Sequence, residues 1–153
     1  MLSVPAYFIE LTERQKMIVP PIVPITALYA AMFGMLFVIL MLAVIRLRRS
    51  LQIGLGDGGN RDLQRAIRVH GNAVECVPVF LVMFAAFELN HGSTLLLHIF
   101  GAAFLAARIA HAWGLFASGG TSPGRLIGTG ATMVLLVALA IANLLQCFWP
   151  HLN

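Results

Sequence analysis

The sequence predicts an all-α fold, a bundle of four helices embedded in a membrane. Of its 153 residues, 59% are hydrophobic and only 10% are charged, whereas a soluble domain carries about 25% charged residues. Four apolar segments are each long enough to cross a hydrocarbon core of about 30 Å. No linker rich in proline, glycine or serine divides the chain into two self-sufficient blocks, so we expect a single transmembrane domain.

The four segments lie at residues 24–45, 61–89, 93–116 and 126–149, within a domain at 24–150. The first segment ends on a basic group, which suits the boundary of a membrane span. The second is longer than a span needs, so we expect its arginine-rich first third to project into the headgroup layer or the aqueous edge. The fourth follows a glycine-rich turn, which separates it from the third.

Residues 1–23 are expected to form an N-terminal extension outside this domain. They carry Glu10, Glu13, Arg14 and Lys16, and no apolar core precedes a small-residue cleavage site. We therefore expect no cleavable signal peptide. The extension either lies at the membrane interface as a short helix or contains an alternative start at Met17.

The distribution of arginine predicts the orientation in the membrane, because positively charged loops remain on the cytoplasmic side. The loop after the first segment is rich in arginine, the loop at 90–92 has no lysine or arginine, and the next loop carries Arg125. The first and third loops should therefore be cytoplasmic, with both termini outside. This topology, together with anionic ligands, accounts for the net charge of +4, so we expect no nucleic-acid partner.

The second segment begins with a row of polar side chains, which we call the polar stripe: Arg61, Arg65, Arg68, Asn72 and Glu75. On a helix these five side chains fall within an arc of about 80°, along about 21 Å of the axis. Such a stripe is unfavourable in a membrane unless it faces protein, water or a ligand. Arginine suits carboxylates, and a glutamate suits an ammonium group. The stripe is therefore either a site for a small charged ligand or an internal ion-pair network in which Glu75 neutralises Arg68.

Three further residues are candidates for chemistry. Arg108 and His111 share one face of the third segment, because they lie three residues apart. Arg108 needs a partner inside an apolar run, and Glu75 is one candidate. His111 either polarises a thiol or is a hydrogen-bonded core histidine. Arg125 opens the fourth segment and either acts in the site or anchors the topology.

Other chemistry is not indicated. No spacing of histidine, cysteine and carboxylate residues predicts a metal site. Cys76 and Cys147 lie in apolar runs, where we expect small buried hydrophobic residues and no disulfide. The glycine-rich loop at 54–60 lacks the residues of a phosphate-binding loop. We expect a tight turn there, with Asn60 or Asp62 capping the next helix.

The pattern Arg65-x-x-Arg68-x-x-x-Asn72-x-x-Glu75-x-x-Pro78 resembles the second-span signature of the MAPEG family, the membrane-associated proteins of eicosanoid and glutathione metabolism. Within that family, the sequence from the glycine-rich loop to Glu75 is most similar to the bacterial YecN-like branch. The resemblance covers about residues 25–147 and implies a homotrimer of four-helix subunits. It also implies that glutathione binds between neighbouring subunits near the cytosolic face.

Carried over residue by residue, the resemblance implies a set of contacts to glutathione. Arg65 and Arg68 would contact its carboxylates or order the site, and Asn72 would bind its polar groups. Glu75 would lie near the γ-glutamyl ammonium, and His70 matches a polar contact of some members. One arginine among Arg46, Arg48 and Arg49 would come from the neighbouring subunit, and Arg108 completes the binding candidates.

The catalytic half of the pattern departs from the family. Members similar to leukotriene C synthase carry a tyrosine on the third span, where this chain has His111. The arginine that stabilises the glutathione thiolate has no gap-free match, although Arg125 fits the spacing of the microsomal glutathione transferases. His111 and Arg125 are therefore the catalytic candidates.

The resulting functional hypothesis is a glutathione transferase or peroxidase of the detoxification type. It would conjugate glutathione to an apolar, lipid-soluble electrophile or reduce a hydroperoxide with it, at the cytoplasmic side of a bacterial inner membrane. The expected partners are glutathione, the electrophile, membrane lipid and two further copies of the chain. A non-catalytic lipid- or ligand-binding protein on the same scaffold is the alternative. A small transporter is a third hypothesis, which the arginine-rich stripe disfavours because cationic cargo needs an isolated carboxylate.

Overall fold

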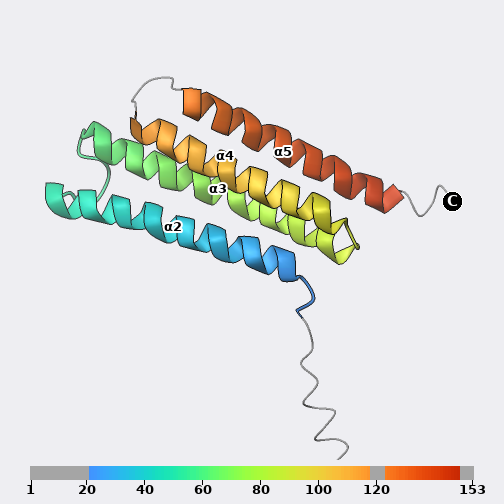
Figure 1. Cartoon of the computed structure of the whole chain (residues 1–153). Coiled ribbons are helices and arrows are strands. Elements are labelled where there is room, and N and C mark those ends of the chain that lie inside the picture. Colours follow the sequence, from blue (N-terminus) through green and yellow to red (C-terminus); the bar gives the residue numbers. More distant parts are fainter. Residues whose placement is uncertain (1–20, 118–122, 149–153) are drawn as a thin grey trace, which may run out of the picture.

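A computed structural model describes residues 21–117 and 123–148 of the chain. These residues form four helices, with no strand among them: α2 (Pro24–Leu51), α3 (Arg61–Leu89), α4 (Thr94–Ala117) and α5 (Pro123–Phe148) (Figure 1). Each helix contains a stretch that is long and apolar enough to cross a membrane. The predicted fold class is therefore confirmed. The predicted N-terminal extension lies mostly outside the described residues.

The helix boundaries follow the sequence closely, with two differences of more than one residue. Helix α2 continues six residues beyond the predicted span and ends where Gln52 adopts a left-handed conformation with φ 55°. Its basic last turn stabilises this longer helix because cations interact favourably with a helix C-terminus. Helix α5 begins three residues early, at Pro123, because proline fits the first position of a helix.

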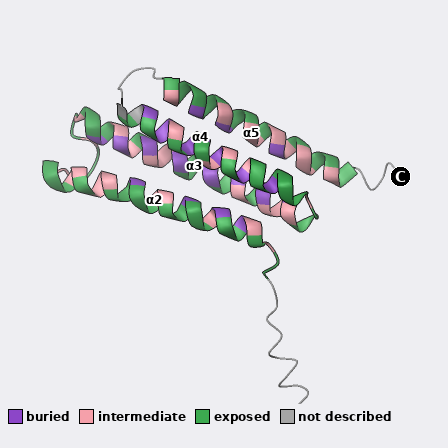
Figure 2. Cartoon of the chain, in the orientation of Figure 1, coloured by how far each residue is buried: buried purple, intermediate pink, exposed green. Residues whose placement is uncertain are grey.

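Helices α3 and α4 form the centre of the bundle. Helix α2 packs mainly on α3, and α5 packs mainly on α4, so α2 and α5 lie on opposite sides and do not contact each other (Figure 1). The outward surfaces of all four helices are rich in exposed residues (Figure 2). Many of these are large and apolar, which suits contact with lipid.

The core is an aromatic cluster shared by α2, α3 and α4. Its centre is Phe104, which stacks on Phe80 with ring centroids 3.9 Å apart and meets the edge of Phe33 at 5.8 Å. All three side chains are fully buried. Ring pairs in these geometries add about 0.5–1.5 kcal/mol each beyond simple burial. This cluster fixes how α3 and α4 face each other, and hence where their polar residues point.

At one end of the bundle, α2 is tied to α3 by a carboxylate that the sequence analysis did not single out. The two oxygens of Glu88 accept hydrogen bonds from the backbone amides of Ile25 and Thr26, at 2.9 and 2.7 Å. These amides belong to the first turn of α2, where helical N–H groups have no partner within the helix. Glu88 therefore caps the N-terminus of α2 from a different helix.

Candidate functional site

The polar stripe lies on the outward face of α3. The inward face of the same helix is formed by small and apolar residues, among them Leu63, Ala66 and Val69. Arg61, Arg68 and Glu75 are exposed, whereas Arg65 and Asn72 are half-buried. The stripe is therefore open to the surroundings of the protomer and is not sealed inside the bundle.

The preceding loop and the N-cap residue Asn60 determine that helix α3 begins at Arg61. Asn60 accepts hydrogen bonds from the backbone amides of Asp62 and Leu63, both at 3.0 Å, which confirms the predicted cap. In the preceding loop, Gly56, Gly58 and Gly59 all have positive φ, a conformation that glycine adopts without strain. The loop therefore turns tightly and sets the first arginines of the stripe at the end of the bundle. Helix α3 then continues unbroken to Leu89.

The charges of the stripe are mostly not neutralised by one another. Arg65 pairs with Asp62 at 3.4 Å, but the Asp62 side chain is largely exposed. Within the described residues, no ion pair joins Arg68 to Glu75. An internal ion-pair network would have needed that contact. The arrangement instead leaves a guanidinium and a carboxylate available on one face of a membrane-spanning helix.

The basic end of α2 divides into two kinds of arginine. Arg48 donates hydrogen bonds to the carbonyls of Ile53 and Gly56, at 3.4 and 2.9 Å, so it holds the loop. Arg46 and Arg49 are exposed at the same end of the helix. Of the three arginines that the family resemblance offered as a contribution to a neighbouring subunit, these two have the freer side chains.

Arg108 lies inside the bundle, only 2% exposed. Its Nη1 donates to the hydroxyl of Thr132 at 3.3 Å, and that hydroxyl donates to the Gly128 carbonyl at 2.7 Å. The guanidinium also lies beside the Cys76 thiol. Glu75 was one candidate for its partner, but no ion pair between Arg108 and Glu75 forms among the described residues. Glu75 points away because it lies on the exposed face of α3.

His111 is also buried, at 4% exposure. Its Nδ1 lies 3.0 Å from the Thr129 hydroxyl, and Gly128 packs so closely that an added Cβ would lie 2.6 Å from the His111 backbone nitrogen. The imidazole is therefore held between α4 and α5 and is not on the exposed face that carries Arg68. Arg125 lies in the first turn of α5 with an exposed side chain, and its backbone lies next to His111.

His70 is half-buried on α3, next to but outside the polar stripe. The binding candidates Arg65, Arg68, Asn72 and Glu75 are thus brought together on one face. His111 and Arg108 form a second, buried group. The described residues of the chain do not bring the two groups into contact.

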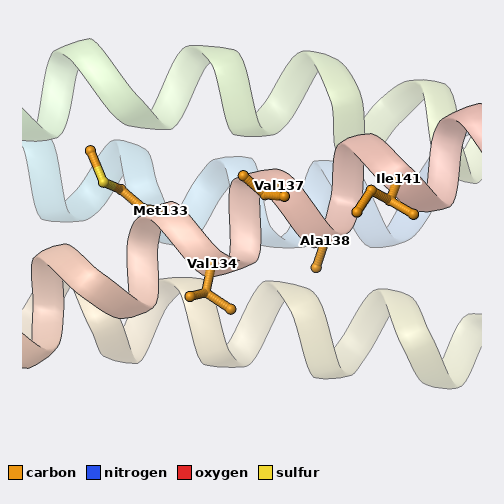
Figure 3. Close-up of a pocket in the computed structure, with 5 residues that line it drawn as sticks. All are labelled: Met133, Val134, Val137, Ala138 and Ile141. Carbon is orange, nitrogen blue, oxygen red and sulfur yellow. The ribbon is translucent and has the colours of Figure 1, made fainter.

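An apolar depression of about 370 Å³ lies on the surface of α5 (Figure 3). Five residues of this one helix line it: Met133, Val134, Val137, Ala138 and Ile141. No polar group lines it, so it suits an acyl chain or another apolar surface and offers nothing for catalysis.

A sequence model of the MAPEG family matches residues 26–145. This chain belongs to the MAPEG family. It is 37% identical over 125 residues to "Inner membrane protein YecN" of Escherichia coli strain K12, a match that covers 82% of this chain and 94% of that protein. The protein of the same name from Escherichia coli O6:H1 matches to the same extent. "Uncharacterized protein sll1147" of Synechocystis is 31% identical over 124 residues, or 80% of this chain and 88% of its own length.

The matched region of this MAPEG chain includes the whole polar stripe and the buried group around Arg108. The family predicted from the signature of the second span is therefore confirmed, as is its YecN-like branch. Four helices able to cross a membrane agree with a multi-pass membrane protein.

Sequence reasoning missed the polar partners inside this MAPEG bundle. Thr129 and Thr132 lie three residues apart, a spacing that a helical projection would have placed on one side of α5. Cys76 was expected to be a plain buried hydrophobic residue, and its proximity to Arg108 depends on the packing of α3 against α4. No local pattern in the sequence indicates that contact.

Proposed function

We propose that this protein is a glutathione-binding membrane enzyme. It conjugates glutathione to an apolar electrophile, or uses it to reduce a hydroperoxide, in a reaction of the detoxification type. The observation that carries the proposal is the polar stripe, because its charged side chains lie on an outward face of a membrane-spanning helix without pairing Arg68 to Glu75. A stripe of this kind requires a covering partner, and the arrangement of its charges suits a small zwitterion.

The dimensions support a tripeptide as the ligand. Arg68 and Glu75 are seven residues apart, or about 10 Å along the helix axis. A fully extended tripeptide spans at most about 10–11 Å. A carboxylate of glutathione at Arg68 and its ammonium at Glu75 would therefore both be reached by one bound molecule.

The charges support the same ligand. Glutathione carries two carboxylates and one ammonium group. Arg65 and Arg68 offer guanidinium donors for carboxylates, whereas Asn72 can donate and accept hydrogen bonds at once. Glu75 is the matching anion for the ammonium. Membership of the MAPEG family, which includes glutathione-dependent enzymes, supports this assignment.

A second copy of the chain is the natural cover for the stripe. We take the assembly to be a homotrimer, in which Arg46 or Arg49 of one subunit reaches the stripe of the next. The relation to an inner membrane protein of Escherichia coli supports a bacterial inner membrane, with the stripe at the cytoplasmic side because the arginine-rich loops lie there.

The chemistry would rest on the thiolate of glutathione. A free thiol has a pKa of about 8.5, so a small fraction is ionised at neutral pH, and a nearby guanidinium increases that fraction. Arg125 is the candidate for this role, because its side chain is exposed at the same end of the bundle as the first arginines of the stripe. Most of the acceleration would come from positioning and from charge stabilisation.

His111 is less suited to the catalytic role because it is buried and bound to Thr129. This observation favours one alternative, a MAPEG protein that binds glutathione or a lipid without chemistry. Conjugation of a generic aromatic electrophile, measured by absorbance in lipid nanodiscs, separates the two: turnover supports an enzyme, and binding without turnover supports the alternative.

The first test is calorimetric titration of glutathione into the purified protein. Arg68→Ala and Glu75→Ala should each lose most of the affinity, whereas Ser93→Ala, an exposed polar residue between α3 and α4 at the other end of the bundle, should keep it. Unchanged affinity in both stripe variants, or no binding by the wild type with or without an apolar co-substrate, would overturn the proposal.

A further inference from the structure

A row of exposed side chains runs along the outward face of α2. We call it the α2 ridge, and its members are Met35, Ile39, Leu42, Arg46 and Arg49. On the helix these five fall within an arc of about 80°, on the side away from the residues that α2 buries in the core. Helix α2 lies at the edge of the bundle and packs mainly on α3 (Figure 1), so the ridge faces away from the other helices.

The ridge changes its chemical character once along its length. Met35, Ile39 and Leu42 are large, apolar and exposed, and the two arginines follow in the last turns of the helix. From Met35 to Arg46 the ridge extends about 16 Å along the helix axis. This is close to the depth of one leaflet, which is half of a hydrocarbon core of about 30 Å. A phospholipid has the same order of parts, a leaflet of hydrocarbon followed by a phosphate.

The two arginines of the ridge are not engaged by the chain itself. Neither Arg46 nor Arg49 forms a hydrogen bond or an ion pair within the part of the chain that the structure describes. The carboxylates at this end are used elsewhere, since Asp57 accepts a hydrogen bond from its own loop and Asp62 pairs with Arg65. Residues three apart on a helix are neighbours on its surface. Two neighbouring guanidiniums suit the oxygens of a phosphate, to which arginine donates charge-assisted hydrogen bonds.

Two other arginines at this end of the bundle are placed differently. Arg48 holds the loop after α2 through two backbone carbonyls. Arg61 is exposed, but its face of α3 continues with Arg65 and Arg68, so no apolar surface leads away from it. The α2 ridge therefore combines a basic end with an apolar track, whereas the polar stripe does not.

We propose that the α2 ridge binds an anionic phospholipid of the cytoplasmic leaflet. The phosphate lies between Arg46 and Arg49, and one acyl chain lies along Leu42, Ile39 and Met35. The lipid is anionic because a zwitterionic headgroup would bring an ammonium group beside the two guanidiniums. Basic clusters at the cytoplasmic end of a membrane span attract anionic lipids for the same reason.

This lipid site goes beyond the proposed glutathione site and does not depend on it. A guanidinium presents five N–H donors, so an arginine that the proposed trimer brings to a neighbouring stripe can also contact a lipid phosphate. The two proposals fail separately, because lipid retention is measured without glutathione. A protein that binds no glutathione can still retain the lipid, and the reverse also holds.

The experiment is native mass spectrometry of the full chain in mild detergent, with equal amounts of phosphatidylglycerol and phosphatidylcholine that carry identical acyl chains. We expect the wild type to retain at least tenfold more phosphatidylglycerol. Glycerol 3-phosphate should displace no more of it than chloride does at equal ionic strength, because the acyl chain is part of the contact. Equal retention of the two lipids, or displacement by glycerol 3-phosphate, would refute the site.

Substitutions then place the lipid on α2. Arg46→Gln should lower the retention of phosphatidylglycerol at least threefold, and the double variant Arg46→Gln/Arg49→Gln at least tenfold. The control Arg61→Gln removes one charge at the same end of the bundle and should keep the wild-type value. If the double variant does not fold, the comparison of Arg46→Gln with Arg61→Gln decides.

Two outcomes would contradict this placement. Wild-type retention in the folded arginine variants, or an equal loss in Arg61→Gln, would show that the lipid does not lie on the ridge. A second copy of the chain is the other occupant to consider. It would leave the wild type without a preference for phosphatidylglycerol and would make the oligomer dissociate in the double variant, and that result would also reject the lipid.

Discussion

The proposed contact between Glu75 and the ammonium of glutathione can be isolated by changing both partners. Glu75→Ala removes the carboxylate, and an analogue of glutathione without its α-amino group removes the ammonium. If the two groups meet, each single change weakens binding, and the second change adds little to the first. The coupling free energy of this cycle measures the contact itself.

The expected magnitude depends on whether the stripe is covered. Glu75 is exposed in the protomer, and exposed ion pairs contribute about 0.2–1 kcal/mol, less than about a sixfold change in Kd. A charge-assisted hydrogen bond shielded from water contributes about 1.5–3 kcal/mol, or roughly ten- to more than a hundredfold in Kd. Because the proposal places a neighbouring subunit over the stripe, we expect the larger value.

The assay is calorimetric titration of both ligands into wild type and Glu75→Ala, in detergent and in nanodiscs. A coupling above about 1.5 kcal/mol supports a covered contact. If Glu75→Ala weakens glutathione and the analogue by the same factor, the carboxylate does not meet the ammonium, and the orientation of the tripeptide on α3 is wrong.

Three other predictions concern the scaffold. Glu88→Gln removes the charge from the cap of α2 and should lower its stability by about 1–2 kcal/mol, seen as a lower Tm in detergent, while an unchanged Tm would deny the cap a stabilising role. Gly128→Ala forces a Cβ against the backbone of α4 and should destabilise the protein by about 1–3 kcal/mol. The control Gly130→Ala, whose added Cβ meets no atom within 4 Å, should be neutral or stabilising. Equal Tm values for the two variants would refute the close packing of α4 on α5. With the native cysteines replaced, an impermeant maleimide should label Ser50→Cys only from the cytoplasmic side and Ser93→Cys only from the other, and the reverse pattern would invert the predicted topology.

The fold could be predicted from the sequence because membrane spans follow from composition and length. The bounds of α3 were predicted to the residue, since Asn60 and the apolar run after Glu75 both mark them. The end of α2 was not, because arginine and leucine continue a helix as readily as they follow one. The cap by Glu88 joins the end of α3 to the start of α2, which are far apart in the sequence. No local sequence pattern predicts it.

The site could be predicted only where it is local. A helical projection placed Arg65, Arg68, Asn72 and Glu75 on one face, and the structure has them on the outward side of α3. The partner of Arg108 could not be predicted, because it depends on how α3, α4 and α5 pack together. Glu75 was a plausible partner by charge, but the packing of α3 turns it outward and turns Cys76 inward.

Helix α2 is fastened to α3 at both ends, by Glu88 at its start and by Arg48 through the loop at its finish. A helix attached at both ends is restrained from sliding along its neighbour and from swinging away from it. The two attachments therefore fix the level of Arg46 and Arg49 relative to α3 within the chain. In the proposed trimer, a neighbouring chain would therefore meet these two arginines at one fixed level.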